Sequence, residues 1–177
     1  VTSEGDISAS NASWWEFDTG RGTNPSIIKT IGNIFAISYE DISSDIYVKT
    51  CQINDTGSIW KTWKDTQAID TTNGDFANLF EVGETDIATK KIYGVSFAGD
   101  SGDGYISIVD IDSTGAIGSE IDTIEFDIYD NLWYARVLPV ANDFWLITYV
   151  GTGNDGWVAT IKIYMPGKSL DKRDESA

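Results

Sequence analysis

The sequence predicts an all-β fold built from three similar units, each of four antiparallel strands. Three stretches align with one another, and each reads as two strands joined by a turn: Ile34–Ile53, Ile92–Ile111 and Asp143–Ile163. Aromatic side chains recur at equivalent places in these copies, first at Tyr39, Phe97 and Tyr149, then at Tyr47, Tyr105 and Trp157. A period of roughly 50 to 60 residues indicates a repeat architecture. No stretch shows the i, i+3, i+4, i+7 spacing of an amphipathic helix.

The composition agrees with one packed β domain. The chain has 177 residues, of which 12% are aromatic and only three are proline. This length allows a single domain with a sizeable core. A chain so rich in aromatic residues is not typical of disorder.

The remaining strands of each unit follow from the same alignment. A short apolar run precedes the two central strands: Pro25–Ile31, Phe76–Val82 and Tyr134–Val140. A longer and more polar outer strand comes before each short run: Ile7–Phe17, Ile59–Ile69 and Ile117–Phe126. Each outer strand ends on a large apolar residue, and an aspartate and a turn follow it. We therefore expect four-stranded sheets with the order short, central, central, outer.

The third strands indicate how these sheets are covered. In Tyr47–Ile53, Tyr105–Ile111 and Trp157–Ile163 both faces are largely apolar, whereas a sheet with one wet face alternates apolar and polar residues. Small residues in the second strands, such as Ala36 and Gly94, would let neighbouring sheets approach closely. Repeated four-stranded sheets that are covered on both sides are typical of the blades of a β-propeller. A β-sandwich is the rival fold, but it gives no reason for a threefold repeat.

The boundaries of the repeats predict that other subunits complete the fold. Ile7–Phe17 is an outer strand with no unit before it, and Ile163 ends a third strand with no outer strand after it. Residues 1–163 would then form three blades, and residues 164–177 a polar tail or linker. Propellers close with about four to eight blades, and a bare edge strand invites pairing. We therefore expect a homo-oligomer that pairs strands 7–17 and 155–163 of different copies.

Three assemblies satisfy this expectation. Two copies would close a ring of six blades with twofold symmetry. If the rotation does not close, the same contact between copies builds a filament. The third alternative is that these residues are a piece of a longer propeller.

With these features, the chain resembles β-propeller repeat proteins. The segments IFAISY, SDIYVKTCQI and GNDGWVATIKI are similar to repeats in surface and secreted proteins of microbes and their viruses. The Trp-Asp and Gly-His signatures of WD40 repeats are absent, and so are those of kelch repeats. Sugar-binding propellers that assemble from small units are similar in architecture, so the resemblance implies a fold and transfers no residue roles.

Charge and composition exclude several classes of function. The chain has 12 basic and 28 acidic residues, a net charge of −16, and no histidine. Such a surface repels nucleic acid, because phosphate binding needs clustered Lys and Arg. The chain also has no apolar run long enough to span a membrane. Without histidine, the usual general base and the commonest metal ligand are missing, and the single Cys51 reads as a small buried hydrophobe.

Repeated acids mark the face where a ligand would bind. One aspartate follows each outer strand, and another stands in each turn between the central strands: Asp18, Asp70 and Asp127, then Asp45, Asp103 and Asp155. Asn154 and Asp100 add oxygen atoms beside them, and a weak Ca²⁺ site at Asp100 and Asp103 is one hypothesis, since Ca²⁺ prefers oxygen ligands. The alternative, which recurrence in every unit favours, is that these side chains accept hydrogen bonds from turn N–H groups.

Aromatic residues lie beside the same turns. Trp133, Trp157, Tyr105 and Tyr47 begin strands next to the acids, and aromatic rings with nearby carboxylates suit carbohydrate. Packing between sheets is the alternative interpretation of Tyr47, Tyr105, Trp157 and Trp145. Exposed roles fit Trp133 and Trp14.

The function that we expect is a non-catalytic binding or assembly module at a cell or virion surface or outside the cell, with a glycan as ligand. The first alternative is a structural protomer of a fibre or surface layer that assembles by strand exchange. The third hypothesis is a glycoside hydrolase, which needs two carboxyl groups at a set separation; Glu40, Glu120 and Glu125 are candidates by residue type alone. No cofactor is expected.

Overall fold

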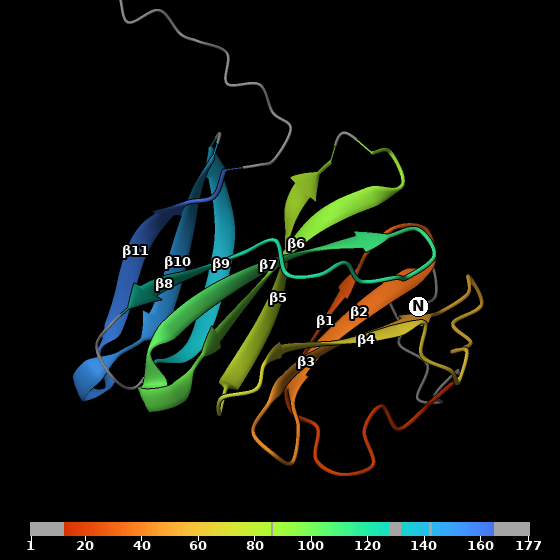
Figure 1. Ribbon diagram of the computed structural model, residues 1–177, viewed down its shortest axis with the longest axis horizontal. Coiled ribbons are helices and arrows are strands. Elements are labelled where there is room, and N and C mark those ends of the chain that lie inside the picture. Colours follow the sequence, from red (N-terminus) through yellow and green to blue (C-terminus); the bar gives the residue numbers. More distant parts are fainter. Residues whose placement is uncertain (1–12, 86, 128–131, 142, 165–177) are drawn as a thin grey trace, which may run out of the picture.

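The computed structural model describes residues 13–85, 87–127, 132–141 and 143–164, and the protein is all-β over these ranges. Three antiparallel sheets of four, four and three strands follow one another along the chain (Figure 1). The helical segments in the described part are two single 3-10 turns, Asp100–Gly102 and Thr152–Asn154. Neither is long or apolar enough to cross a membrane. The all-β prediction is therefore confirmed.

Within each sheet the strands lie in sequence order. Sheet 1 contains β1 (Thr23–Lys29), β2 (Ile34–Glu40), β3 (Ile46–Gln52) and β4 (Asp65–Asp70). Sheet 2 contains β5 (Asp75–Glu84), β6 (Lys90–Ala98), β7 (Gly104–Asp112) and β8 (Asp122–Asp127). Sheet 3 contains β9 (Trp133–Ala141), β10 (Phe144–Val150) and β11 (Gly156–Lys162). The predicted order of short, central, central and outer strands is confirmed in sheets 1 and 2.

The three sheets share details that a chance similarity would not produce. The aligned aromatic residues are cross-strand partners in every sheet: Tyr39 with Tyr47, Phe97 with Tyr105, and Tyr149 with Trp157. The first strand of each sheet carries an irregularity at the same place, with one residue at positive φ: Asn24, Phe76 and Tyr134. An L-residue at positive φ is strained, so its recurrence shows that the three units have the same backbone plan.

The outer strands are shorter than the sequence pattern predicts. Ile59 and Ile117, the predicted first residues, form only isolated bridges to Ile53 and Ile111. The chain then bulges away from the sheet, and regular pairing begins at Asp65 in β4 and at Asp122 in β8. The apolar pattern does not reveal this bulge, because residues on both sides of it still meet the third strand.

The first predicted outer strand, Ile7–Phe17, is described only from Ser13 onward, and Ser13–Phe17 is not a strand. This segment packs on sheet 1, where the Phe17 ring meets the Tyr39 ring edge-on at 5.3 Å. Phe126, at the end of β8, meets Tyr149 of sheet 3 in the same way at 5.5 Å. Phe17 therefore has the place on sheet 1 that an outer-strand end has on the next sheet. Residues 7–12, the other part of the predicted strand, and 165–177, nearly all of the predicted tail, lie outside the described residues.

The sheets stack face to face by one rule. We call the face that carries Tyr39, Phe97 or Tyr149 the aromatic face of its sheet, and the other the opposite face. The aromatic face of sheet 2 packs on the opposite face of sheet 1, where Val95 and Val109 join Val48 in one core cluster. The aromatic face of sheet 3 packs on the opposite face of sheet 2, where Trp145 joins Ile106. Sheet 2 is thus covered on both faces, and the buried Trp145 confirms its predicted packing role.

The first strands of the sheets lie side by side, with β5 in contact with both β1 and β9. Figure 1 shows this arrangement, in which the three sheets fan out from their first strands. Within sheet 2, a Cβ atom at Gly94 would lie 2.1 Å from the ring of its cross-strand partner Phe80, and that ring meets Trp145 of sheet 3 at 5.6 Å. Gly94 thus makes room for a ring of its own sheet, and the expectation that small residues of the second strands let neighbouring sheets approach stays a prediction.

Candidate functional site

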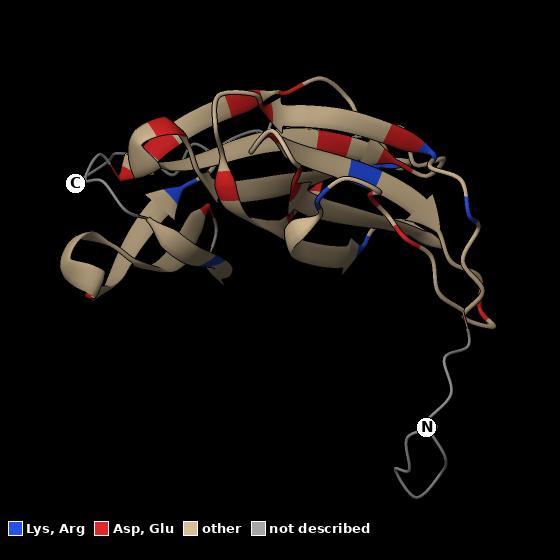
Figure 2. Cartoon of the chain, turned by 90° about the horizontal axis from the view of Figure 1, so that it is seen from below, with Lys and Arg blue, Asp and Glu red and all other residues tan. Residues whose placement is uncertain are grey.

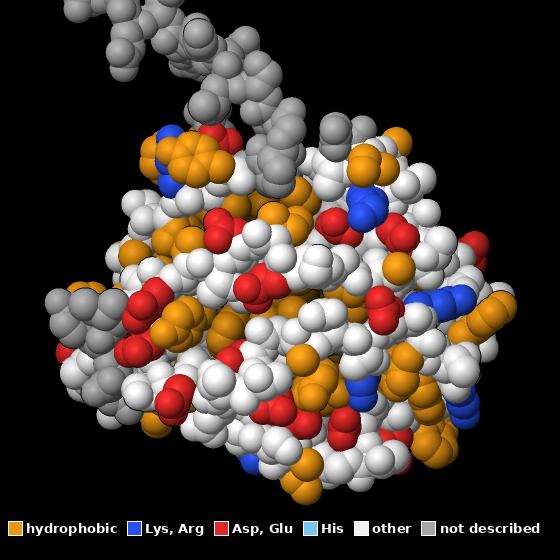
Figure 3. Space-filling model, viewed as in Figure 1, with side chains coloured by type: hydrophobic (Ala, Val, Ile, Leu, Met, Phe, Trp, Pro, Cys, Tyr) orange, Lys and Arg blue, Asp and Glu red, His pale blue; other side chains and the backbone are white. Residues whose placement is uncertain are grey.

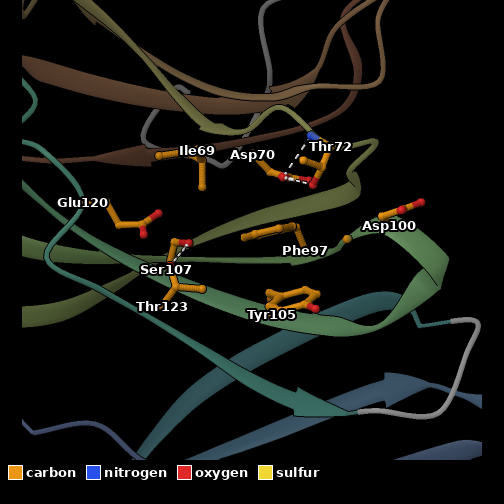
Figure 4. A pocket seen from close by; sticks show the side chains of 10 residues that line it. Ile69, Asp70, Thr72, Phe97, Asp100, Tyr105, Ser107, Glu120 and Thr123 are labelled. Carbon is orange, nitrogen blue, oxygen red and sulfur yellow. Dashed lines mark hydrogen bonds between the residues drawn. The ribbon is translucent and has the colours of Figure 1, made fainter.

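The candidate site is a cavity of about 300 Å³ between sheets 1 and 2 (Figure 4). Sheet 1 contributes the end of β4 and the turn that follows it. Sheet 2 contributes its aromatic face and the loop before β8. The lining side chains are acidic, hydroxyl-bearing or aromatic, with one aliphatic residue: Ile69, Asp70, Thr72, Phe97, Asp100, Tyr105, Ser107, Glu120 and Thr123. Backbone of Gly99 completes the wall. A volume of this size lies at the lower end of ligand pockets, so it suits one sugar ring or one side chain.

The aromatic wall is held by strand pairing. Phe97 in β6 and Tyr105 in β7 are directly opposite each other, and their rings stack at 5.7 Å with planes 22° apart. The Tyr105 ring also lies over Gly99, where a Cβ atom would be only 2.6 Å away from it. Glycine at position 99 therefore leaves room for the ring, and the pair presents a fixed apolar surface to the cavity.

The polar wall is only partly satisfied by the protein itself. Asp70 Oδ1 accepts hydrogen bonds from the backbone N–H of Thr72 at 3.1 Å and from its hydroxyl at 2.6 Å. The other oxygen, Oδ2, is buried and has no hydrogen-bond partner among the described residues. Opposite, the hydroxyls of Ser107 and Thr123 bond to each other at 2.7 Å. An unpaired buried carboxylate oxygen costs free energy, so Asp70 is the group in this cavity with an unmet need for a donor.

The charged residues that line the cavity are all acidic. None of its lining residues is basic. Burial and then the nearby carboxylates, Glu125 first, followed by Asp103, Asp70 and Asp100, raise the pKa of Tyr105. Acidic positions outnumber basic ones along the chain in Figure 2, and Figure 3 shows acidic side chains spread over one face of the molecule. The site therefore attracts positively charged or hydrogen-bond-donating groups.

Two of the predicted site residues, Tyr105 and Asp100, line this cavity, and the others are distributed over all three sheets. Tyr47 stacks on Tyr39 in sheet 1 at 6.0 Å. Trp133, 42% exposed, contacts the ring of Phe76 at 5.9 Å. The others stand in or beside turns between central strands: Asp45 in sheet 1, Asp103 in sheet 2, and Asn154, Asp155 and the 51%-exposed Trp157 in sheet 3. The structure thus places most of them at equivalent positions and does not gather them into one site.

Some of the acids in and beside the turns accept backbone hydrogen bonds. Asp41 Oδ1 accepts from the N–H groups of Ser43 and Asp45, and Asp18 Oδ1 accepts from that of Gly20. Asp100, in the suggested Ca²⁺ site with Asp103, accepts from the N–H of Ser101 at 3.0 Å. Over the described ranges, no three Asp, Glu, Cys or His side chains are grouped as metal ligands. Turn formation, the favoured alternative for these acids, is confirmed for Asp18, Asp41, Asp70 and Asp100, and for the other acids it stays a prediction.

The sequence reasoning missed the polar wall of the cavity. Asp70 was one of three equivalent acids, Glu120 a candidate by residue type, and Ser107 and Thr123 carried no signal of their own. A signal did exist in the aligned repeats, because Ser107 stands where sheet 1 has Lys49. Its meaning depends on knowing which carboxylate faces that position, and only the structure shows this.

Comparison with known proteins adds no identification. No protein-family model matches the chain, and no curated protein matches it.

Proposed function

We propose that the protein is a non-catalytic binding module of a cell surface, a virion surface or the extracellular space, and that its cavity between sheets 1 and 2 binds carbohydrate. The observation that carries this proposal is the composition of the cavity wall. A fixed aromatic pair, Phe97 and Tyr105, stands across from hydroxyl and carboxylate groups. Sugars present apolar C–H faces, which stack on rings, and hydroxyls, which need polar partners.

Glycan-array binding followed by calorimetry tests this proposal. The Tyr105→Ala variant should lose at least about tenfold in affinity, because the stacking surface is removed. Tyr47→Ala is the matched control, since Tyr47 has the same place in sheet 1, away from the cavity. Equal loss in both variants, or no glycan bound by the wild type, would contradict the proposal. Turnover of aryl glycosides would point instead to the glycoside hydrolase.

A second candidate function, assembly, is favoured by the two ends of the stack of sheets. The opposite face of sheet 3 is apolar and exposed, with Leu138, Phe144 and Val158 on it. The aromatic face of sheet 1, at the other end, carries the exposed Ile27 and is only partly covered. These are the two kinds of face that pack together inside the chain. A second copy can therefore continue the stack by the same rule.

On this basis the three sheets act as propeller-type blades that other copies complete, either as a closed ring or as a filament. The edge strand β11, which has no outer strand beside it in the described residues, also offers backbone groups for pairing. Native mass spectrometry tests assembly directly. A dimer supports the ring and a series of larger species supports the filament, and the Val158→Lys variant should dissociate either. A monodisperse monomer at high concentration would exclude assembly.

A further inference from the structure

The three units provide an internal comparison for the cavity. In each unit an aspartate that follows an outer strand lies against the aromatic face of the next sheet. In sheet 1 this residue is Asp18, whose Oδ2 accepts hydrogen bonds from the Tyr39 hydroxyl at 3.0 Å and from Lys49 Nζ at 3.2 Å. Lys49 Nζ also donates to the carbonyl oxygen of Phe17 at 3.2 Å.

The Lys49 ammonium group is held by aromatic rings as well. It lies 4.9 Å from the centre of the Tyr39 ring and 5.2 Å from that of Trp63. A carboxylate, a carbonyl oxygen and two ring faces together form a binding site for an ammonium ion. In sheet 1 this site, which we call the slot, is occupied by the Lys49 side chain.

In sheet 2 the same slot has lost its occupant. By the register of the repeats, Phe97 stands in place of Tyr39, and Ser107 in place of Lys49. The equivalent of Trp63 is Glu120, since the residues after each, Lys64 and Ile121, donate to the equivalent carbonyls of β3 and β7. The phenol, the ammonium group and the indole are all absent, and the cavity lies where they would be.

In the third unit the ammonium group is absent too, because Ala159 stands in place of Lys49, but the phenol is kept. There the buried Asp127 retains a hydrogen bond to Tyr149, the counterpart of Tyr39. Of these three aspartates, Asp70 is the one with a buried oxygen that has no donor in the described part of the chain. This oxygen is buried, and Asp70 is also one of the residues that line the cavity.

We propose that the cavity between sheets 1 and 2 binds the primary ammonium group of a ligand, in the place that the Lys49 ammonium group has in sheet 1. The ligand carries this group on a short apolar stem or a sugar ring, as a lysine side chain or an amino sugar does. This inference rests on the proposed function, because it uses the same cavity. It adds that the cavity selects ligands by their ammonium group. Asp70 accepts the ammonium hydrogen bond, Glu120 adds a second negative charge, and Phe97 and Tyr105 contact the stem.

An ammonium group fits this wall better than a bare metal ion. Ca²⁺ needs six to eight oxygen ligands, whereas the described carboxylates are not grouped as metal ligands and two stacked aromatic rings form part of the wall. An ammonium ion needs about three acceptors and is stabilised beside ring faces. The replacement of Trp63 by Glu120 also adds negative charge at a place where a neutral ligand would gain little from it.

Calorimetric titration at about pH 6, where amines carry their proton, tests the inference. The ligands are Nα-acetyl-lysine methylamide and glucosamine, with norleucine and N-acetylglucosamine derivatives as neutral counterparts. Each amine should bind at least about tenfold more tightly than its neutral counterpart. The two amines distinguish a peptide ligand from a sugar ligand.

Variants locate the binding. Ser107→Lys should supply the missing ammonium group from the chain itself, abolish amine binding and raise the melting temperature. Thr66→Lys, which adds the same charge on the exposed outer strand of sheet 1, is the control and should bind as the wild type does. If Ser107→Lys does not fold, Glu120→Gln serves, because Glu120 is exposed, and it should weaken amine binding several-fold.

Three outcomes would overturn the inference. If neutral sugars bind as tightly as glucosamine, the carbohydrate proposal stands and the ammonium requirement fails. If the amines bind and a folded Ser107→Lys variant binds them equally well, the amine lies elsewhere. If glycans bind and amines do not, only the ammonium inference is refuted. If neither class binds, the proposed carbohydrate function is refuted as well.

Discussion

Removal of Lys49 should open in sheet 1 the slot that is open in sheet 2. The Lys49 side chain is 14% exposed and its partner Asp18 is 18% exposed, so the ion pair is shielded from water for the most part. Lys49→Ala deletes the ion pair, the hydrogen bond to Phe17, two ring contacts and the apolar stem. Lys49→Met keeps the stem and deletes the charge.

The expected cost follows from these contacts. Hydrogen bonds to charged groups contribute about 1.5–3 kcal/mol, and each ring contact about 0.5–1 kcal/mol. Part of this is offset because the ammonium group returns to water. We therefore expect a loss of about 2–4 kcal/mol for Lys49→Ala and about half of that for Lys49→Met. At about 2–4 °C per kcal/mol for a chain of this size, Lys49→Ala should melt roughly 5–15 °C lower.

Chemical rescue by an added amine then distinguishes loss of the ammonium contact in the slot from a general loss of stability. Propylamine should raise the melting temperature of Lys49→Ala by more than that of the wild type, and propanol should not. At ten times its dissociation constant, the amine restores about 1.4 kcal/mol. Lys64→Ala, which removes an ammonium group over the ring of Trp60, is the control and should show no extra gain. Equal rescue by amine and alcohol would refute the view of this slot as an ammonium site.

Three further changes test the packing and the titration of buried groups. Gly94→Ala forces a Cβ atom against the Phe80 ring and should lower the free energy of unfolding in urea by about 1–3 kcal/mol. Adding Phe80→Leu should restore much of this loss. If the losses of the two single variants simply add in the double variant, the contact is contradicted. Glu40 is 2% exposed, and burial, with a hydrogen bond to Asp75, raises its pKa above 4.5. The native state therefore holds this proton more tightly, so stability from this group falls as pH rises from about 4.5 through the raised pKa. Glu40→Gln should reduce this dependence of the free energy of unfolding on pH, measured by urea unfolding at several pH values. An unchanged pH dependence would show that other groups cause it. Burial also raises the pKa of the Cys51 thiol, so the folded protein should resist iodoacetamide until urea unfolds it, and fast labelling without urea would show local opening.

The fold was predictable from the sequence to the extent that the repeats align. Aligned aromatic residues such as Tyr39 and Phe97 are cross-strand partners that set the register, and a register error would move every side chain to the wrong face. The bulge after Ile59 was not predictable, because it changes backbone pairing and leaves the apolar pattern intact. The positive φ of Phe76 and Tyr134 was not predictable either, since neither residue type favours it.

The candidate site was predictable only in its chemistry. Acidic and aromatic residues beside the turns are visible in the sequence, and Tyr105 and Asp100 do line the cavity. The place of the cavity depends on which of three equivalent slots is filled. Residues that fill a slot come from far apart in the chain, as Lys49 and Asp18 do in sheet 1. An alignment of the three repeats does not show which side chains are in contact.

The positions of sheets 1 and 2 in the stack account for the difference between their two slots. Sheet 2 is covered by core clusters on both faces, so its strand pairing does not need a further contact with Asp70. Sheet 1 stands at one end, where Ser13–Phe17 has no strand pairing of its own and is held by side chains. There Lys49 joins Phe17 and Asp18 to the sheet and stabilises the end of the stack. On the ammonium proposal, substitution at three equivalent positions converts a structural contact into an open site, and it does so in the unit where the fold has least need of that contact.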